Sequence, residues 1–424
     1  MRLRFAIPTL ALVLSASACA TTGHDTAAPG TPAVTVGVAG ERAPRRSDRV
    51  LILKNYQGAV VVGTATGAVA FRAPYGVAAP DSSTIVQAEP ITSGTRVVAS
   101  DPLTGVPRWS HDVAGTKRVR VVSPGGRYVA LVDGDLNTAA QPRAATLVTV
   151  ATAKGARTLR LTGNFDPEAF SVDGRTLFAL EFIPAMNPTR YSVRRIDLQT
   201  LRVSTVPGRD GEDRTPMSGY SRTQLMSPDG TQLYTFYATS APVTENGETY
   251  HAFVHVLNLA KGWAHCIDLD EKIGASGTAN PALAVSPDGS RLFVTDGVAN
   301  AIAAIDTHTL RVLRTRYLPV LGNPEQAAIT ATDGRFVFAR SGSQVVAIDA
   351  HTLLESPAAE FSASGLTALH VDGSGEAFYL LTADGLLVVD RHGRILHRWP
   401  SPGDATSIDP AVSVPGSGAY RCAC

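Results

Sequence analysis

The stretch Ala284-Val-Ser-Pro-Asp-Gly-Ser-Arg-Leu-Phe-Val-Thr-Asp296 contains the pattern that decides the fold. A short apolar run reaches Ser-Pro-Asp-Gly and is followed by a second apolar run, Leu-Phe-Val. Because Asp caps its own turn and Gly accepts positive φ, the pattern predicts two strands joined by a tight turn. A further apolar run then ends at Asp306-Thr-His-Thr before another strand, which predicts a second hairpin.

Both signatures recur along the chain. The first signature, the Pro/Asp-Gly turn, begins at Ser123, Ser171, Ser227, Ser286, Ala331 and Val371. The second signature, an apolar run closed by Asp or a similar turn residue, occurs at Asp101, Val150, Asp197, Asn258, Asp306, Asp349 and Asp390. The second signature repeats at intervals of 49, 47, 61, 48, 43 and 41 residues, which indicates seven units of four strands each.

The predicted fold class is all-β, a β-propeller of seven four-stranded blades. A four-stranded sheet cannot bury both faces alone, but sheets arranged radially bury them against each other. The chain ends leave an alternative open. Residues 50–71 offer extra strands, and the segment from Ile408 to Tyr420 reads as a degraded hairpin copy, so the two ends are expected to share one blade. An eighth blade built from both ends is therefore the alternative to seven.

The best repeat resembles the YVTN repeats of bacterial seven-bladed surface propellers. It runs from Asn280-Pro281 through the quoted stretch to Leu310, and Gly322-Asn-Pro324 opens the next copy in the same style. The resemblance covers about residues 110–400 and implies an exported interaction or ligand-binding module without fixed catalytic residues.

The first residues predict export. Arg2 and Arg4 precede the apolar run Phe5–Leu14, and Ala16-Ser-Ala-Cys19 resembles the lipobox of bacterial lipoproteins. We therefore expect a signal peptide over 1–18, a lipidated Cys19 with a flexible tether over 19–49, and a propeller over 50–424 in which 401–424 is a closing tail. The expected location is extracytoplasmic, anchored to the membrane through Cys19. Ordinary cleavage after Ala-Ser-Ala is the alternative.

Charge and motifs exclude several functions. Lys and Arg number 38 against 37 Asp and Glu, so no bulk charge favours nucleic acid. No nucleophile elbow or zinc-helix motif occurs, and we predict no catalytic residue, no metal, no cofactor and a monomer. His308, His351 and His392 are interpreted as turn residues. Packing is preferred to ion binding for His251, His255 and His265. The pairing of Cys266, Cys422 and Cys424 stays open.

Long loops mark the predicted recognition surface. In a propeller, the loop between the second and third strands of a blade and the loop to the next blade open on one face, and in this chain 134–143, 183–190, 207–223 and 238–248 are long. The candidate ligand- or partner-binding residues are Asp133, Asp135, Asn137, Asn187, Arg190, Tyr191, Asp210, Glu212, Asp213, Arg214, Tyr220, Glu245, Glu248 and Tyr250. Mixed charge and tyrosine suit a protein or glycan partner. The alternative is an exported metal-assisted hydrolase or lactonase using Asp133, Asp135, Asp210, Glu212 and Asp213.

Overall fold

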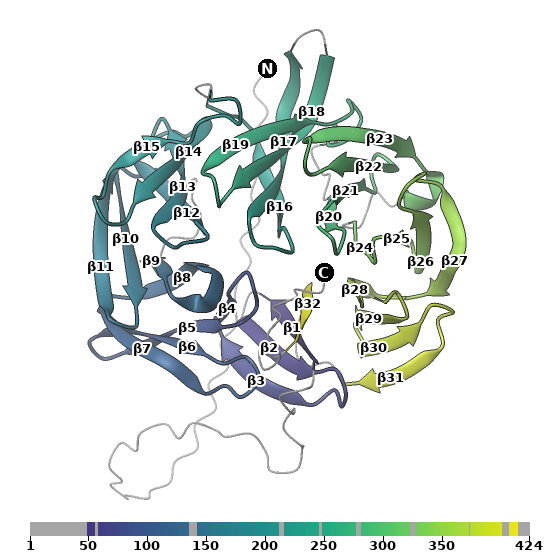
Figure 1. Ribbon diagram of the computed structural model, residues 1–424, viewed down its shortest axis with the longest axis horizontal. Coiled ribbons are helices and arrows are strands. Elements are labelled where there is room, and N and C mark those ends of the chain that lie inside the picture. Colours follow the sequence, from purple (N-terminus) through teal and green to yellow (C-terminus); the bar gives the residue numbers. More distant parts are fainter. Residues whose placement is uncertain are drawn as a thin grey trace, which may run out of the picture. The chain divides into compact units, whose positions relative to one another are not determined.

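The computed structural model describes residues 49–55, 58–134, 142–211, 216–245, 248–276, 281–322, 328–372, 374–400 and 407–413. Thirty-two strands form eight four-stranded antiparallel sheets in these ranges, arranged as the blades of a propeller (Figure 1). Two short 3-10 turns, Pro124–Gly126 and Pro319–Leu321, are the helical elements of the described chain. Among these residues no helix has the length and apolarity needed to cross a membrane.

The first four blades contain strands that pair in the following order. Blade 1 contains β32 (Ser407–Ser413), β1 (Arg49–Asn55), β2 (Gly58–Gly63) and β3 (Val69–Pro74). Blade 2 contains β4 (Val77–Ala78), β5 (Ile85–Ile91), β6 (Gly94–Ser100) and β7 (Pro107–Ala114). Blade 3 contains β8 (Lys117–Val122), β9 (Val129–Asp133), β10 (Ala145–Thr152) and β11 (Gly155–Thr162). Blade 4 contains β12 (Asn164–Phe170), β13 (Thr176–Ile183), β14 (Arg190–Asp197) and β15 (Val203–Thr205).

The remaining four blades follow the same plan. Blade 5 contains β16 (Tyr220–Met226), β17 (Gln232–Glu245), β18 (Glu248–Asn258) and β19 (Trp263–Asp268). Blade 6 contains β20 (Ala282–Val285), β21 (Arg291–Asp296), β22 (Ala301–Asp306) and β23 (Arg311–Tyr317). Blade 7 contains β24 (Thr330–Thr332), β25 (Phe336–Ser341), β26 (Gln344–Asp349) and β27 (Glu355–Ser362). Blade 8 contains β28 (Leu366–Val371), β29 (Ala377–Thr382), β30 (Gly385–Asp390) and β31 (Ile395–Trp399).

The predicted count of seven blades is wrong, and the alternative of an eighth, shared blade is correct. The seven Asp-type signatures mark blades 2 to 8, each built from one continuous segment. Blade 1 has the same turn, because the Gly67 N–H donates to the Gly63 carbonyl at 2.8 Å, as the Gly105 N–H does to the Asp101 carbonyl. Because Gly63 stands where the signature has Asp, the second signature is not recognisable in the sequence of this blade.

The predicted turn chemistry is present. In the turn after β22, the Asp306 carboxylate accepts the backbone N–H groups of His308 and Thr309 at 2.9 and 2.7 Å. In the turn before β21, the Ser286 hydroxyl donates to Asp288 at 2.6 Å. These short-range bonds lower the pKa of both carboxyl groups, chiefly through backbone donors at Asp306 and the serine hydroxyl at Asp288.

The core lies between blades rather than within them. Every pair of neighbouring blades shares a cluster of buried apolar side chains among the described residues. Between blades 7 and 8, for example, the Phe338 and Phe378 rings meet edge-to-face at 4.7 Å. Between blades 4 and 5 there is a second cluster, built on Tyr191, Tyr237 and Phe253. That interface therefore buries phenol groups as well as hydrocarbon.

Candidate binding sites

The predicted recognition loops belong to blades 3, 4 and 5 and leave the propeller on one side. They are the connections β9–β10, β13–β14 and β17–β18 and the link from β15 to β16. Of the predicted residues, Asn187, Arg190 and Asp210 are exposed and Tyr250 is half-buried. Asp135, Asn137, Glu212, Asp213 and Arg214 lie outside the described residues, as does Cys19. Tyr220, Glu245 and Glu248 lie on described strands, but their side chains are not described.

Two predicted residues already have structural partners. The carboxylate of Asp133, at the end of β9, accepts a hydrogen bond from Lys117 Nζ at 2.5 Å. Tyr191 is only 3% exposed, and its ring stacks on Tyr237 with centroids 4.9 Å apart. Tyr191 therefore packs inside the interface between blades 4 and 5 and offers no surface to a macromolecular partner.

The β17–β18 hairpin is longer than its blade requires. Pairing of β17 with β16 ends at Ala238, and pairing of β18 with β19 ends at Phe253. Beyond a register shift, the two strands continue only with each other, from Val243 opposite Tyr250 to Glu245 opposite Glu248. In Figure 1 this extension projects outward from the ring of blades. Its backbone edges therefore have no strand partner in the described chain.

The β13–β14 loop of blade 4 has an exposed apolar side chain next to an exposed polar one. Met186, in the β13–β14 loop, is 60% exposed. It lies beside the exposed Asn187. An exposed anchor with a polar neighbour is typical of a protein contact.

A central cavity of about 280 Å³ is lined by the innermost strands and the turns that follow them. Its walls include Leu283, Leu369 and Ile408, with Lys54 of β1, Gln224 and His370 among the polar members. His370 is 5% exposed, and burial lowers the pKa of its imidazole to about 4, so the ring is neutral at physiological pH. The cavity wall is thus mostly small or apolar.

A belt of charged groups crosses the innermost strands of blades 3 to 5. Arg120 in β8 binds Asp166 in β12 with two parallel bonds of 2.7 and 2.6 Å. Gln224 in β16 donates to Glu168 Oε1 at 3.2 Å. The other oxygen, Glu168 Oε2, is buried and has no hydrogen-bond partner in the described structure. Burial, with the nearby Asp166 charge, raises the pKa of Glu168 to about 7, although Arg120 opposes the rise.

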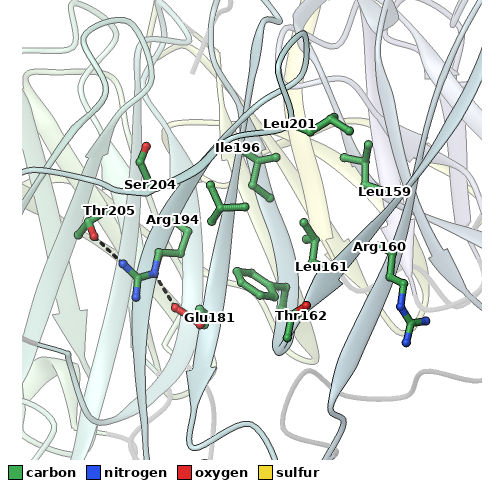
Figure 2. Close-up of a pocket in the computed structure, with 12 residues that line it drawn as sticks. Leu159, Arg160, Leu161, Thr162, Glu181, Arg194, Ile196, Leu201, Ser204 and Thr205 are labelled. Carbon is green, nitrogen blue, oxygen red and sulfur yellow. Dashed lines mark hydrogen bonds and ion pairs between the residues drawn. The ribbon is translucent and has the colours of Figure 1, made fainter.

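A groove of about 520 Å³ lies at the outer rim between blades 3 and 4 (Figure 2). Leu159, Arg160 and Leu161 of β11 are among the residues that line it. On the facing blade, Arg194 donates to Glu181 Oε2 and to Thr205 Oγ1, both at 2.5 Å. The Arg194 guanidinium therefore already has two protein partners.

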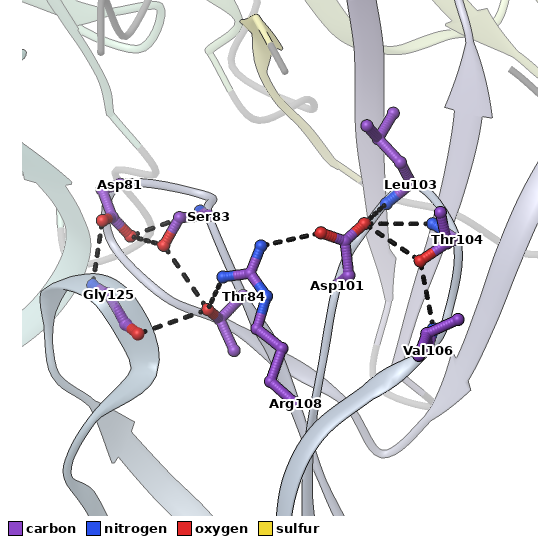
Figure 3. A network of polar contacts seen from close by, with 9 residues as sticks. All are labelled: Asp81, Ser83, Thr84, Asp101, Leu103, Thr104, Val106, Arg108 and Gly125. Atoms are coloured by element: carbon purple, nitrogen blue, oxygen red, sulfur yellow. Dashed lines mark hydrogen bonds and ion pairs between the residues drawn. The ribbon is translucent and has the colours of Figure 1, made fainter. Parts of the chain in front are cut away.

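A second polar network joins blades 2 and 3 and is structural (Figure 3). Arg108 donates to Asp101 at 2.7 Å and to the Thr84 hydroxyl at 3.1 Å. Thr84 in turn donates to the Gly125 carbonyl at 3.4 Å, and the Gly125 N–H donates to Asp81 at 2.9 Å. Each of these groups already has a protein partner. The network therefore links the two blades and is not a ligand site.

No cluster of three or more His, Cys, Asp or Glu side chains is placed to hold a metal in the part of the chain that the structure describes. His308, His351 and His392 are exposed turn residues, as the repeat pattern predicts. The carboxylate set of the hydrolase alternative cannot be assembled from the described chain, because three of its five members are outside the described ranges.

The geometry defines a β-propeller protein with long loops on one side of blades 3 to 5. No family model and no curated protein matches the chain. Among solved structures, BamB from Moraxella catarrhalis is similar at 14% identity, over 80% of this chain and 94% of that chain, with a TM-score of 0.41. Apo AztD from Citrobacter koseri is similar at 10% identity, over 75% and 95%, with a TM-score of 0.44. Kuenenia stuttgartiensis hydrazine synthase is similar at 15% identity, over 81% and 93%, with a TM-score of 0.43. At identities and TM-scores this low, the likeness assigns no function.

Proposed function

We propose that this chain is an exported binding protein, tethered to the bacterial membrane through Cys19, that recognises a protein partner with the long-loop side of blades 4 and 5. The observation that carries the proposal is the β17–β18 extension, whose strands, among the residues that the structure describes, pair only with each other beyond Ala238 and Phe253. Its side chains Ala241, Pro242, Thr244 and Thr249 are exposed. Apart from Tyr250, which packs against the cluster of Tyr191, Tyr237 and Phe253, the described side chains of the extension lie outside the core clusters, and contact with another molecule would account for them.

A protein partner fits this surface better than a glycan. The free backbone edges of the extension suit an added strand from an extended peptide. Met186 supplies an exposed apolar anchor on the adjacent blade, and methionine is enriched at protein interfaces. The YVTN-like repeats and the lipobox-like Ala16-Ser-Ala-Cys19 support the same class of function, a surface-bound interaction module.

Site-specific photo-crosslinking in intact cells tests the recognition surface. A photoreactive residue at Met186 or Thr244 is expected to give the same discrete adduct. The same residue at Leu313, which is 52% exposed on β23 of blade 6, serves as the matched control and should give none. Identical adducts from all three positions, or none from the first two, would contradict the proposal.

A hairpin deletion separates binding from folding. Replacing residues 240–250 by Asn-Gly joins Thr239 to His251 with a two-residue hairpin turn. The hydrogen bond from Thr239 Oγ1 to the His251 carbonyl, 3.0 Å long, can remain. The deletion also removes Tyr250, which packs against the cluster of Tyr191, Tyr237 and Phe253, so the unfolding free energy should fall by roughly 1–3 kcal/mol while the propeller stays folded. The adduct at Met186 should disappear.

The tether has an independent test. Mass spectrometry of the mature N-terminus from native membranes is expected to show a diacylated Cys19. An unmodified residue other than Cys19 at that terminus would refute anchoring and leave the recognition surface unaffected.

A further inference from the structure

A thiol and a thioether from distant parts of the sequence meet at the interface between blades 4 and 5. Cys266 Sγ, in β19, lies 3.5 Å from Met217 Sδ, in the link between β15 and β16. Cys266 is also directly opposite His255 of β18 in the antiparallel register. Cross-strand partners place their Cβ atoms about 5 Å apart on one face of the sheet. Three donor side chains from three segments therefore gather at one place.

Backbone pairing holds the thioether in position. Met217 exchanges two backbone hydrogen bonds with Tyr191 of β14, both 2.8 Å long. Earlier in the same link, Gly208 forms a parallel bridge with Ala264 of β19. The two described ends of the link are thus tied to blades 5 and 4, and Met217 lies against Cys266.

A small cavity lies among these groups. It measures about 20 Å³ and is lined by Met217, His255, His265 and Cys266 together with Val193 and Val206. A single water needs about 10–15 Å³ by this kind of measure, so the space suits one atom or ion and no organic molecule. The rest of the lining is mixed, with Ala264 and the two valines beside the hydroxyl residues Ser192 and Thr205.

We propose that Cys266, Met217 and His255 form a binding site for monovalent copper. Thiolate and thioether sulfur select Cu(I), and imidazole is compatible with it. With metal–sulfur distances of about 2.3 Å, as zinc–thiolate bonds have, two sulfurs on one tetrahedral ion lie about 3.8 Å apart, so the observed pair needs to open only slightly. A structural zinc site needs four N or S ligands, whereas no three His, Cys, Asp or Glu side chains are grouped to hold a metal in the described ranges.

Binding of Cu(I) to this site needs no electron donor. Cu(I) arrives already reduced, the Cys266 thiol releases its proton to solvent, and the charge of the site is unchanged. Cys266 and Met217 are partly exposed, so the ion has a path from outside. His255 is 1% exposed, and the Tyr237 ring meets its imidazole edge-on with centroids 6.2 Å apart.

The test uses the full chain with Cys19, Cys422 and Cys424 replaced by serine, because those thiols would also bind Cu(I). Anaerobic Cu(I) competition against bathocuproine disulfonate, repeated with air-stable Ag(I), should show one bound ion. Loss of outer-shell partners typically costs 10–100-fold in metal affinity, so C266S should lower the affinity by more than about 100-fold. M217L and H255Q should each lower it by at least about 10-fold. X-ray absorption of the loaded protein should show two sulfur neighbours and one nitrogen neighbour.

Matched controls come from the same chain. M186L removes an exposed thioether on blade 4, and H111Q removes a histidine on β7 of blade 2; neither should change the affinity. Cu(I) affinity that is unchanged in both C266S and M217L would overturn the proposal, as would preference for Zn(II) over Cu(I). If C266S does not fold, M217L decides the question, because leucine preserves the volume and apolar character of the side chain.

Discussion

Leu53 in β1 lies directly opposite Ile408 in β32, so the first and last strands of the propeller are hydrogen-bonded neighbours. Ile408 packs against the cluster between blades 8 and 1, which includes Leu51, Tyr379 and Trp399. The innermost strand of blade 1 therefore comes from the other end of the chain. Closure of the propeller depends on this single strand.

Deleting residues 407–413 should lower the unfolding free energy by several kcal/mol and cause aggregation. The deletion removes the inner strand of blade 1 and exposes the edge of β1. Thermal melting and size-exclusion chromatography measure both effects. Removing residues 20–45, which the sequence predicts to be a tether, is the control and should be almost neutral. A tail-deleted protein that melts with the intact chain and stays monomeric would contradict closure by β32.

Gly67→Ala should destabilise the same seam. Gly67 has φ +71°, and an added Cβ would lie 2.1 Å from Cγ of Trp399 in the neighbouring blade. Gly230 has φ +70° with open space around it, so Gly230→Ala isolates the backbone strain. We expect Gly230→Ala to lower the unfolding free energy by about 1–2 kcal/mol. Gly67→Ala should lower it by about 1–3 kcal/mol more, because the indole of Trp399 must move. Equal losses by chemical denaturation would show that the Trp399 contact is unimportant.

Glu168→Gln should stabilise the protein at alkaline pH and have little effect at acid pH. Burial raises the pKa of Glu168 from 4.5 to about 7, so the folded state binds its proton more tightly than the unfolded state. The contribution of protonated Glu168 to the unfolding free energy is therefore fully present below pH 4.5 and is lost as the pH rises through about 7. The neutral amide avoids that loss, and the gain at pH 8 should be about 1–3 kcal/mol. A gain that does not vary between pH 4 and pH 8 would mean that the carboxyl group is not the cause.

Thr84→Val should weaken the contact between blades 2 and 3. Thr84 is 1% exposed, accepts a hydrogen bond from Arg108 and donates one to the Gly125 carbonyl. Valine keeps the shape but removes both hydrogen bonds of the hydroxyl, at a cost of about 0.5–1.5 kcal/mol. Urea unfolding measures the change. A loss below about 0.3 kcal/mol would indicate that the hydroxyl bonds contribute nothing net.

The local turns were predictable because their causes are short-range. The Asp306 carboxylate reaches N–H groups two and three residues further on, and the Ser286 hydroxyl reaches Asp288. Such contacts depend on neighbouring residues alone, so each repeat could be recognised wherever its Asp was kept. For the same reason blade 1 has no repeat signature and was predicted only as the alternative, since its turn at Gly63 has the same backbone bond without the side chain.

The candidate sites were predictable only in part. Loop lengths indicated the side of the propeller that carries the long hairpin, because insertions can be counted in a sequence. The burial of Tyr191 could not be read there, because its stacking on Tyr237 joins two different blades. The buried carboxyl of Glu168 was likewise missed, since Gln224 and Asp166 surround it only after blades 3 to 5 assemble.

The sequence by itself determined the strand-turn-strand repeat, the turn residues and the all-β class, because alternation of apolar residues and Asp-Gly chemistry act within a few positions. Only the tertiary structure decided that there are eight blades, that Ile408 lies opposite Leu53, and that Cys266 meets Met217. These relationships arise from radial packing, in which each sheet must cover the face of the next. Closure of the ring of blades determines which distant segments become neighbours. No local pattern in the sequence encodes these contacts.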